Sequence, residues 1–160
     1  MGEIAFKYAR RSDLPIILQF IKELAEYEGL AEKLAVTEES LEDWIFIRNK
    51  AEVLFETVDG NVIGFCLFYH NFSTFMGGAG LYIEDLYVRP EYRGHGYGKQ
   101  LFKKIARMAV DRECKKLEFS CPNTNTSSLE FYKHMGASPM NDWTTFRVSS
   151  NDLTNLAEKT

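Results

Sequence analysis

The sequence predicts an α/β fold in which helices flank a mixed central sheet. Runs rich in β-branched and aromatic residues alternate with longer segments whose apolar residues recur at helical spacing. The predicted order is β-α-α-β-β-β-α-β-α-β. Three strands follow one another directly and others are separated by helices, an order that is typical of a mixed sheet. With 160 residues and 45% hydrophobic content, the chain is expected to form a single domain over residues 1–160.

The first strand is expected at 4–8, and a helix follows it. Ser12 is a good N-cap for this helix, and Pro15 is tolerated in a first turn. The apolar stripe that follows predicts that the helix runs to about Glu28. The chain therefore begins with a strand and an amphipathic helix.

A second helix is expected after Thr37, which is its predicted N-cap, with two glutamates in the first turn. Its residues expected to face inward are Leu41, Trp44 and Ile45. The Asp59-Gly60 pair then predicts a hairpin turn. The expected later elements are strands at 53–57, 62–68 and 81–88, a helix at 99–112, a strand at 117–120, a helix at 127–134 and a closing strand at 143–148.

Composition narrows the class of protein. The formal net charge of −4 argues against a nucleic-acid surface and favours a cationic small molecule. No apolar run reaches the length of a membrane span, and the N-terminus carries no signal-peptide pattern. The cysteines are odd in number and lack C-x-x-C spacing, which fits a reducing, cytoplasmic compartment. The three histidines are scattered, so no metal site is expected.

The most informative segment is 93–98, Arg-Gly-His-Gly-Tyr-Gly, between a predicted strand and a predicted helix. Glycines allow the backbone to approach a ligand closely, and a helix start offers unpaired N–H groups, so the segment suits phosphate or pyrophosphate. The alternative is a glycine-rich connector that only turns the chain. The segment lacks the hydroxyl of a P-loop and the spacing of a dinucleotide fingerprint, which leaves Arg-x-x-Gly-x-Gly.

This pattern resembles the acetyl-CoA loop of the GCN5-related N-acetyltransferases (GNAT). Further segments occur in the order of the diamine (spermidine/spermine) or thialysine acetyltransferase branch, at 21–28, 82–85, 91–94, 131–133 and 136–138. The resemblance implies the GNAT fold and acetyl-CoA as acetyl donor. The residues that it implies in acetyl-CoA binding are Leu86, Tyr87, Val88, Arg93, Gly94, His95, Gly96, Tyr97, Gly98, Lys99, Asn125, Ser127 and Ser128. Asn125 also reads as a helix cap or turn residue.

Two catalytic roles are implied by the same resemblance. Glu84 matches a glutamate that faces the substrate amine, and Tyr132 matches a tyrosine that protonates or orients the departing sulfur. Glu84 and Asp85 are adjacent on a strand, so their side chains should point to opposite faces unless a bulge intervenes. The alternatives are a solvated acid for Glu84 and simple aromatic packing for Tyr132.

The substrate side is implied by Tyr27 and Glu28, by Glu84 and by Asp142, which together predict an acidic pocket. Thr124 departs from the branch, which often has tryptophan there, so the resemblance to polyamine acetyltransferases is weaker at the amine pocket. The expected activity is direct attack of the primary amine of a diamine, polyamine or lysine-like amino acid on acetyl-CoA.

Two other functions stay open. One is an acyl-CoA-binding regulatory module without turnover, and the other is acetylation of proteins or peptides. Related enzymes are commonly homodimers, and the expected strand at 143–148 is a candidate for exchange between subunits.

Overall fold

The computed structural model describes residues 2–159 and divides into two compact units, one up to Ser120 and one from Cys121 onward. The first unit holds a five-stranded sheet with the order β1-β2-β3-β4-β5. The strands are β1 (Ile4–Tyr8), β2 (Glu52–Val58), β3 (Asn61–Ser73), β4 (Gly78–Val88) and β5 (Leu117–Phe119). The first four pair antiparallel and β5 pairs parallel to β4, so the prediction of a mixed sheet is confirmed.

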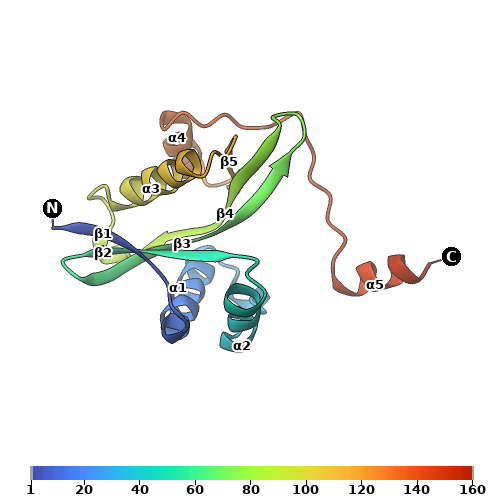
Figure 1. Cartoon of the computed structure of the whole chain (residues 1–160), viewed down its shortest axis with the longest axis horizontal. Coiled ribbons are helices and arrows are strands. Elements are labelled where there is room, and N and C mark those ends of the chain that lie inside the picture. The colour runs from blue at the N-terminus through green and yellow to red at the C-terminus, as the bar shows by residue number, and fades with distance from the viewer. Residues whose placement is uncertain (1, 160) are drawn as a thin grey trace. The chain divides into compact units, whose positions relative to one another are not determined.

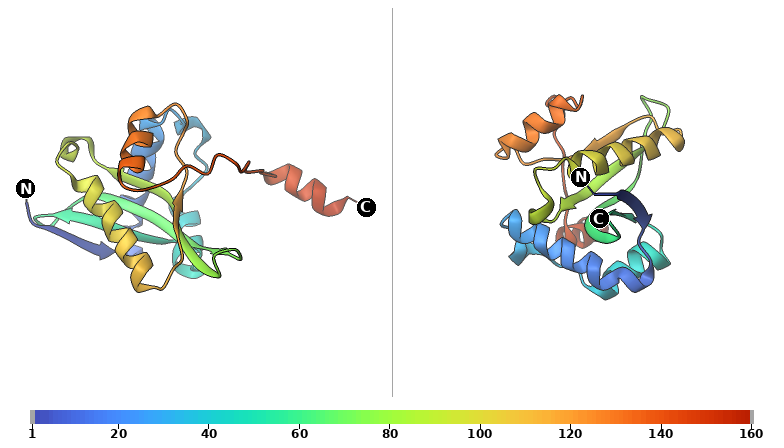
Figure 2. Two further views of the ribbon diagram at one scale, coloured as in Figure 1. Left: turned by 90° about the horizontal axis from the view of Figure 1, so that it is seen from above. Right: turned by 90° about the vertical axis from the view of Figure 1, so that its left-hand side faces the viewer.

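Helices cover both faces of this sheet (Figures 1 and 2). Helices α1 (Leu14–Tyr27) and α2 (Glu38–Leu41) pack on one face, called the α1 face here. Helix α3 (Tyr97–Asp111) packs on the opposite face, called the α3 face. The core of the α1 face is built from apolar side chains of α1, α2 and the central strands, including Ile17, Phe20, Phe55, Phe65 and Tyr87.

The start of α1 differs from the prediction. A 3₁₀ turn occupies Arg11–Asp13, and Asp13 rather than Ser12 is the N-cap position of the helix. The Asp13 carboxylate accepts a hydrogen bond from the Arg10 N–H at 2.8 Å, so it closes the turn ahead of the helix. Pro15 lies in the first turn, where its missing N–H costs no helical hydrogen bond.

The second helix confirms Thr37 as N-cap but not all of its inward face. The Thr37 side chain accepts from the Ser40 N–H at 3.1 Å. After Leu41 the chain widens into a π-helix over Glu42–Ile47. Because a π-helix has more residues per turn than an α-helix, Ile45 stays on the same side as Leu41 and is buried, whereas Trp44 is turned away from that side. Trp44 is 49% exposed, and the Arg48 guanidinium lies over its ring. The expectation that Trp44 faces inward is therefore wrong.

The β2–β3 hairpin turns at the predicted pair. Asp59 and Gly60 both have positive φ, at 49° and 84°, as a two-residue type I′ turn requires. Strands β3 and β4 extend further than predicted and meet in a second hairpin. Helix α3 begins two residues before the expected start, which places Gly98 inside its first turn.

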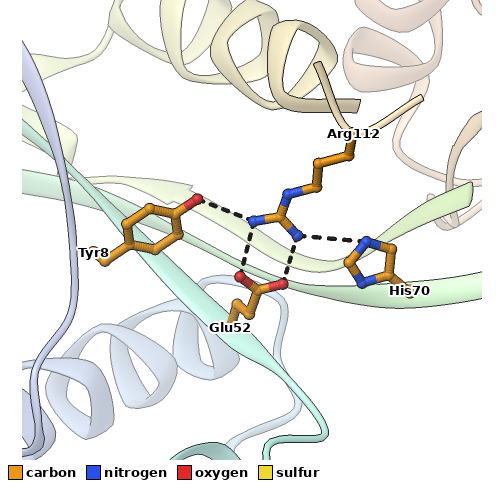
Figure 3. Close-up of polar contacts among 4 residues, drawn as sticks. All are labelled: Tyr8, Glu52, His70 and Arg112. Atoms are coloured by element: carbon orange, nitrogen blue, oxygen red, sulfur yellow. Dashed lines mark hydrogen bonds and ion pairs between the residues drawn. The ribbon is translucent and has the colours of Figure 1, made fainter. Parts of the chain in front are cut away.

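A polar cluster ties the end of α3 to three strands (Figure 3). Arg112, the C-cap of α3, donates to both Glu52 carboxylate oxygens at 2.7 and 2.9 Å and to the Tyr8 hydroxyl at 3.0 Å. It also approaches His70 Nε2 at 3.5 Å. The hydrogen bond to Glu52 is the main cause of the raised pKa of Arg112.

A hollow of about 340 Å³ lies beside this cluster, lined in part by Tyr8, Phe46 and Glu52. Glu52 begins β2, whereas the loop after Val88 lies beyond the other end of that strand, next to the Gly64 pairing. The hollow is therefore remote from the predicted acetyl-CoA loop.

The second unit contains helices α4 (Thr126–His134) and α5 (Ser150–Glu158). The expected closing strand at 143–148 is wrong, because this segment has no regular structure. A strand needs a neighbour to take up its backbone N–H and C=O groups, and no strand of residues 2–159 pairs with it. Its apolar side chains are accordingly exposed, at 70% for Trp143 and 90% for Phe146.

Within residues 2–159, no helix has both the length and the apolar character that a membrane crossing demands. The same residues contain no group of three or more histidine, cysteine, aspartate or glutamate side chains arranged to hold a metal ion.

Candidate active site

The glycine loop has the geometry of an anion cradle. Gly94 and Gly96 have φ of 81° and 84°, a left-handed conformation that other residues adopt only with strain. Gly96 is the N-cap of α3, so the unpaired amides of the first turn begin directly behind it. A Cβ at Gly94 would meet no atom within 4 Å, so the cradle is open. This backbone fits the pyrophosphate of acetyl-CoA.

Tyr97 anchors the loop to the sheet by packing into an apolar cluster. Its side chain is buried with Val58, Ile63 and Val88, and its ring packs edge-on against Tyr92 at 6.1 Å. His95 and Lys99 are exposed. The loop backbone is thereby fixed by an apolar anchor, while two polar side chains of the predicted binding set remain in solvent.

Arg93 lies differently from its glycine neighbours. Its Nε donates to the Val88 carbonyl at 2.8 Å. Its guanidinium carbon lies 4.6 Å from the ring centroid of Tyr27 and 5.3 Å from that of Tyr87. The first side chain of the loop motif therefore reaches toward α1 and β4.

The strand before the loop has an unpaired edge. Pairing of β4 with β5 ends at Ile83 opposite Phe119, and on that side no strand of residues 2–159 pairs with the stretch from Glu84 to Val88. Within this stretch Leu86 is half-buried, whereas Tyr87 and Val88 are buried. The Val88 carbonyl already accepts from Arg93, but other backbone groups along such an edge are available to a ligand, which suits the predicted role of this stretch along the pantetheine arm.

A β-bulge resolves the placement of the two adjacent acids. Leu67 of β3 pairs with Asp85, but the next residue, Phe68, pairs with Ile83, so Glu84 is an extra residue in β4. Simple alternation would send the Glu84 and Asp85 side chains to opposite faces. The bulge breaks that alternation, so the expectation of opposite faces does not apply here.

Asp85 lies near two further carboxyl groups at this bulge. Burial raises the pKa of Asp85 to about 6, and the negative charges of Glu84 and Glu28 add to the shift. Glu28 is the C-cap of α1, so the end of that helix and the bulge lie close together. Glu84 and Glu28 are exposed, and Asp85 is half-buried. The α1 face therefore carries a concentrated negative charge beside Tyr27.

Two tyrosines extend this acidic region, and sequence reasoning missed both, along with Asp85. The rings of Tyr69 and Tyr82 stack with centroids 5.2 Å apart. Burial raises the pKa of Tyr69, and Glu84 is its first charged contributor. Cross-strand pairing places Tyr69 opposite Tyr82, a relation that depends on the register and is invisible in the linear sequence.

The remaining predicted residues belong to the second unit. Asn125 is the N-cap of α4, and its side-chain oxygen accepts from the Ser128 N–H and the Ser127 hydroxyl, both at 3.2 Å. Its capping role is thus confirmed. Tyr132 is half-buried on α4 with its ring 5.2 Å from that of Phe131, and Asp142 is exposed. The roles of these residues in binding and catalysis stay predictions.

Comparison with known proteins identifies the family. The acetyltransferase (GNAT) family model matches residues 17–137. Thialysine N-epsilon-acetyltransferase of Bos taurus is 34% identical over 171 residues, which cover 99% of this chain and 100% of that protein. Spermidine/spermine N(1)-acetyltransferase-like protein 1 of Homo sapiens is 27% identical over 98% of this chain and 24% of its own length.

A solved structure extends the likeness to the fold. An integron cassette protein from the mobile metagenome of V. cholerae superposes with a TM-score of 0.80 at 27% identity, over 99% of each chain. The family match, the full-length relative and the glycine loop at the start of α3 agree. The chain belongs to the GNAT family and is an N-acetyltransferase whose acetyl donor is acetyl-CoA.

Proposed function

We propose that this enzyme acetylates a primary amine of a small cationic substrate that carries a second charged group, such as a lysine-like amino acid or a diamine. The observation that carries the proposal is the group of carboxyls formed by Glu28, Glu84 and Asp85 at the bulge. Several carboxylates around one site attract ammonium groups and disfavour neutral or anionic substrates. The higher identity to the thialysine enzyme, 34% against 27%, favours amino-acid-like amines over polyamines.

The amine must lose a proton before it attacks. An alkylammonium has a reference pKa of about 10.4, so the neutral amine is scarce at pH 7. Carboxylates next to the ammonium raise its pKa further, so they assist only when one of them also accepts the proton. Glu84 is the proposed acceptor, directly or through a water. Asp85, with a pKa of about 6, is a second candidate because an acceptor works best near the operating pH.

Bound acetyl-CoA supplies an acyl group activated as a thioester and a thiolate leaving group. The backbone of Leu86 to Val88 is proposed to align the thioester carbonyl. The Tyr132 phenol is proposed to donate its proton to the sulfur as it leaves. From the reference pKa values of about 10 for a phenol and about 8.5 for a thiol, this transfer is uphill by about 2 kcal/mol, which is a small part of an enzymatic barrier. Tyr132→Phe is then expected to lower kcat more than it weakens acetyl-CoA binding. Equal loss of both would contradict the acid role.

A screen of amines tests the substrate. Release of CoA thiol is measured with thialysine, putrescine, spermidine and a neutral-tailed monoamine of similar length, at low and high salt. We expect higher kcat/KM for the charged amines and a smaller advantage at high salt, because salt screens the carboxylates. Preference for the neutral-tailed amine at both salt levels would overturn the acidic-pocket proposal. If the protein binds acetyl-CoA tightly but releases CoA thiol with none of these amines, a regulatory module is favoured. If only peptides added to the same assay are acetylated, protein acetylation is favoured.

The proposed pyrophosphate contact has its own test. Gly96→Val forces a branched residue into a left-handed conformation and is expected to weaken acetyl-CoA binding by about ten-fold or more. Gly77→Val is the matched control, because Gly77 has a similar left-handed φ of 80° and open space around it but lies in the turn between β3 and β4. Calorimetry on folded variants measures both. Equal affinities for the Gly96→Val variant and the unaltered enzyme would remove the loop from the site.

We also propose a cytoplasmic homodimer in which the segment 140–156 meets a second copy. Support comes from its exposed apolar side chains, Met140, Trp143, Phe146, Val148, Leu153 and Leu156. The backbone of 143–148, which is rich in β-forming residues, would gain a strand partner in the other subunit. Light scattering of the intact enzyme should give twice the chain mass, and Trp143→Ser with Phe146→Ser should give the chain mass. A monomeric unaltered enzyme would refute the dimer.

A further inference from the structure

Arg93 connects two parts of the first unit that lie on different faces of the sheet. The loop to which it belongs leads into α3, and the loop anchor Tyr97 belongs to the apolar cluster of Val58, Ile63 and Val88. The Arg93 side chain, however, stacks on Tyr87, which belongs to the core of the α1 face. It also stacks on Tyr27, the last residue of α1. One side chain thus links the predicted cofactor loop to the acidic side of the site.

The Arg93 guanidinium contacts one buried ring, that of Tyr87, and one exposed ring, that of Tyr27. Tyr87 is 5% exposed, and its hydroxyl donates to Glu23 Oε1 at 2.9 Å, so it is held in place. Tyr27 is 66% exposed, so its position depends on few contacts, and the Arg93 guanidinium at 4.6 Å is one of them. Arg93 Nε is itself tied to the Val88 carbonyl at the end of β4.

From these contacts we infer that Arg93 is a positioning residue that couples occupancy of the glycine loop to the amine side of the site. The inference rests on the proposed function for the role of Tyr27. Ordering of the loop by the pyrophosphate holds Arg93 in place. Arg93 in turn holds Tyr27, and with it the end of α1 that carries Glu28. Acetyl-CoA then strengthens amine binding, and the amine strengthens acetyl-CoA binding by the same factor.

The competing assignment is that Arg93 binds acetyl-CoA directly. In that case the guanidinium pairs with a phosphate and Tyr27 gains nothing from it. The geometry favours the positioning role, because Arg93 Nε is hydrogen-bonded to the backbone and the guanidinium carbon lies over the rings of Tyr27 and Tyr87. An exposed cation–π contact corresponds to about a two- to five-fold effect on an equilibrium constant, which sets the size expected for the coupling.

The first experiment needs no turnover. Hydrogen exchange at residues 24–28 is measured with and without acetyl-CoA. We expect acetyl-CoA to slow exchange there in the unaltered enzyme and in Tyr27→Phe, which keeps the ring, but not in Arg93→Gln or Tyr27→Leu. Arg89→Gln is the matched control, because Arg89 lies over Phe20 instead and should retain the protection. Equal slowing in the unaltered enzyme and Arg93→Gln, each saturated with acetyl-CoA, would overturn the inference.

The second experiment is a double-mutant cycle on amine binding with thialysine at saturating acetyl-CoA. Arg93→Gln and Tyr27→Leu should each raise the amine KM, and the effect of the double variant should fall short of their product by about two- to five-fold. If the two substitutions raise the amine KM by factors that multiply fully in the double variant, the inference is wrong. Weaker acetyl-CoA binding by Arg93→Gln with an unchanged amine KM would likewise assign Arg93 to the phosphate. If the unaltered enzyme acetylates no amine, the proposed function fails while the hydrogen-exchange result still decides the coupling.

Discussion

Two carboxyl groups on the central sheet, Asp85 and Glu56, have raised pKa values for different reasons. Asp85 lies at the bulge of β4 with Glu84 and Glu28 nearby, and its pKa of about 6 reflects burial together with negative neighbours. Glu56 is fully buried in β2, and burial alone raises its pKa to about 7. Neither Glu56 carboxylate oxygen has a hydrogen-bond partner among the described residues.

The position of Glu56 in the sheet identifies its surroundings. It pairs with Phe6 on one side and Gly64 on the other, and Lys104 of α3 lies over the Phe6 ring at 5.8 Å. Alternation from Phe55, which belongs to the α1-face core, places the Glu56 side chain on the α3 face. The same direction of pKa shift therefore has two origins here: burial with converging negative charges at Asp85, and burial alone at Glu56, where the isolated carboxyl carries a desolvation cost.

The largest expected effect is on activity at the bulge. Asp85→Asn and Glu84→Gln are each expected to lower kcat/KM by about 10²-fold, because each removes a candidate proton acceptor. Glu84→Gln should also shift the acid limb of the pH profile to lower pH, since one of the charges that raise the Asp85 pKa is gone. Initial rates at saturating acetyl-CoA from pH 5 to 9 measure both effects.

A control separates this effect from a general loss of charge. Asp111→Asn removes an exposed carboxylate that pairs with Arg107 on α3, away from the bulge, and should leave the profile unchanged. Rates in Asp85→Asn and Glu84→Gln that match the unaltered enzyme at every pH would show that neither acid accepts the proton.

The second effect concerns stability at Glu56. Between about pH 4.5 and 7 the unfolded chain releases the Glu56 proton while the folded protein retains it, so this group makes the protein less stable as pH rises. Above pH 7 its cost is constant. Glu56→Gln removes the cost, so its advantage in unfolding free energy should grow by about 1–3 kcal/mol from pH 4.5 to pH 8.

Denaturant unfolding at a series of pH values measures this advantage. Glu130→Gln makes the same chemical change at an exposed position on α4 and should show no such trend. Stability curves of Glu56→Gln and the unaltered enzyme that run parallel across this range would mean that Glu56 titrates normally.

The smallest effect sharpens the contrast between paired and unpaired polar groups. Tyr87 on the α1 face donates to Glu23, and burial with this hydrogen bond raises the pKa of Tyr87 to about 12. Tyr87→Phe should cost about 1 kcal/mol of unfolding free energy, as should Glu23→Leu, which removes the acceptor, and the double variant should cost no more than either alone. Thermal and denaturant unfolding measure the cycle. Fully additive losses would show that the two side chains stabilise the fold independently.

Much of the fold followed from local patterns because local physics governs those elements. The Asp59-Gly60 turn, the Thr37 cap and the strands beside them depend on residues that are close in sequence. The glycine loop belongs to the same class, since positive φ at Gly94 and Gly96 and the helix start behind them need only a short segment. The resemblance to the GNAT family rested largely on this loop, and the family match confirms it.

Other features depended on contacts that the linear sequence does not record. The outward position of Trp44 follows from a widened helical turn, and the bulge at Glu84 follows from how β4 registers against β3. The segment at 143–148 is rich in aromatic and β-branched residues but lacks a strand partner among residues 2–159. Residue types of this kind favour an extended chain, but only a neighbouring strand supplies the hydrogen bonds that make it a strand.

By itself the sequence determined the mixed α/β fold, the local form of the glycine loop and the family, and it supplied the residues proposed for the amine side. Only the tertiary structure decided how those residues meet. A bulge places Glu84 and Asp85 near Glu28. The Arg93 side chain points toward Tyr27 and Tyr87. Glu56 is buried with no hydrogen-bond partner among the described residues. The physical reason is that charge interactions and stacking depend on distance through space, which register and packing set, whereas turns and caps depend on neighbours along the chain.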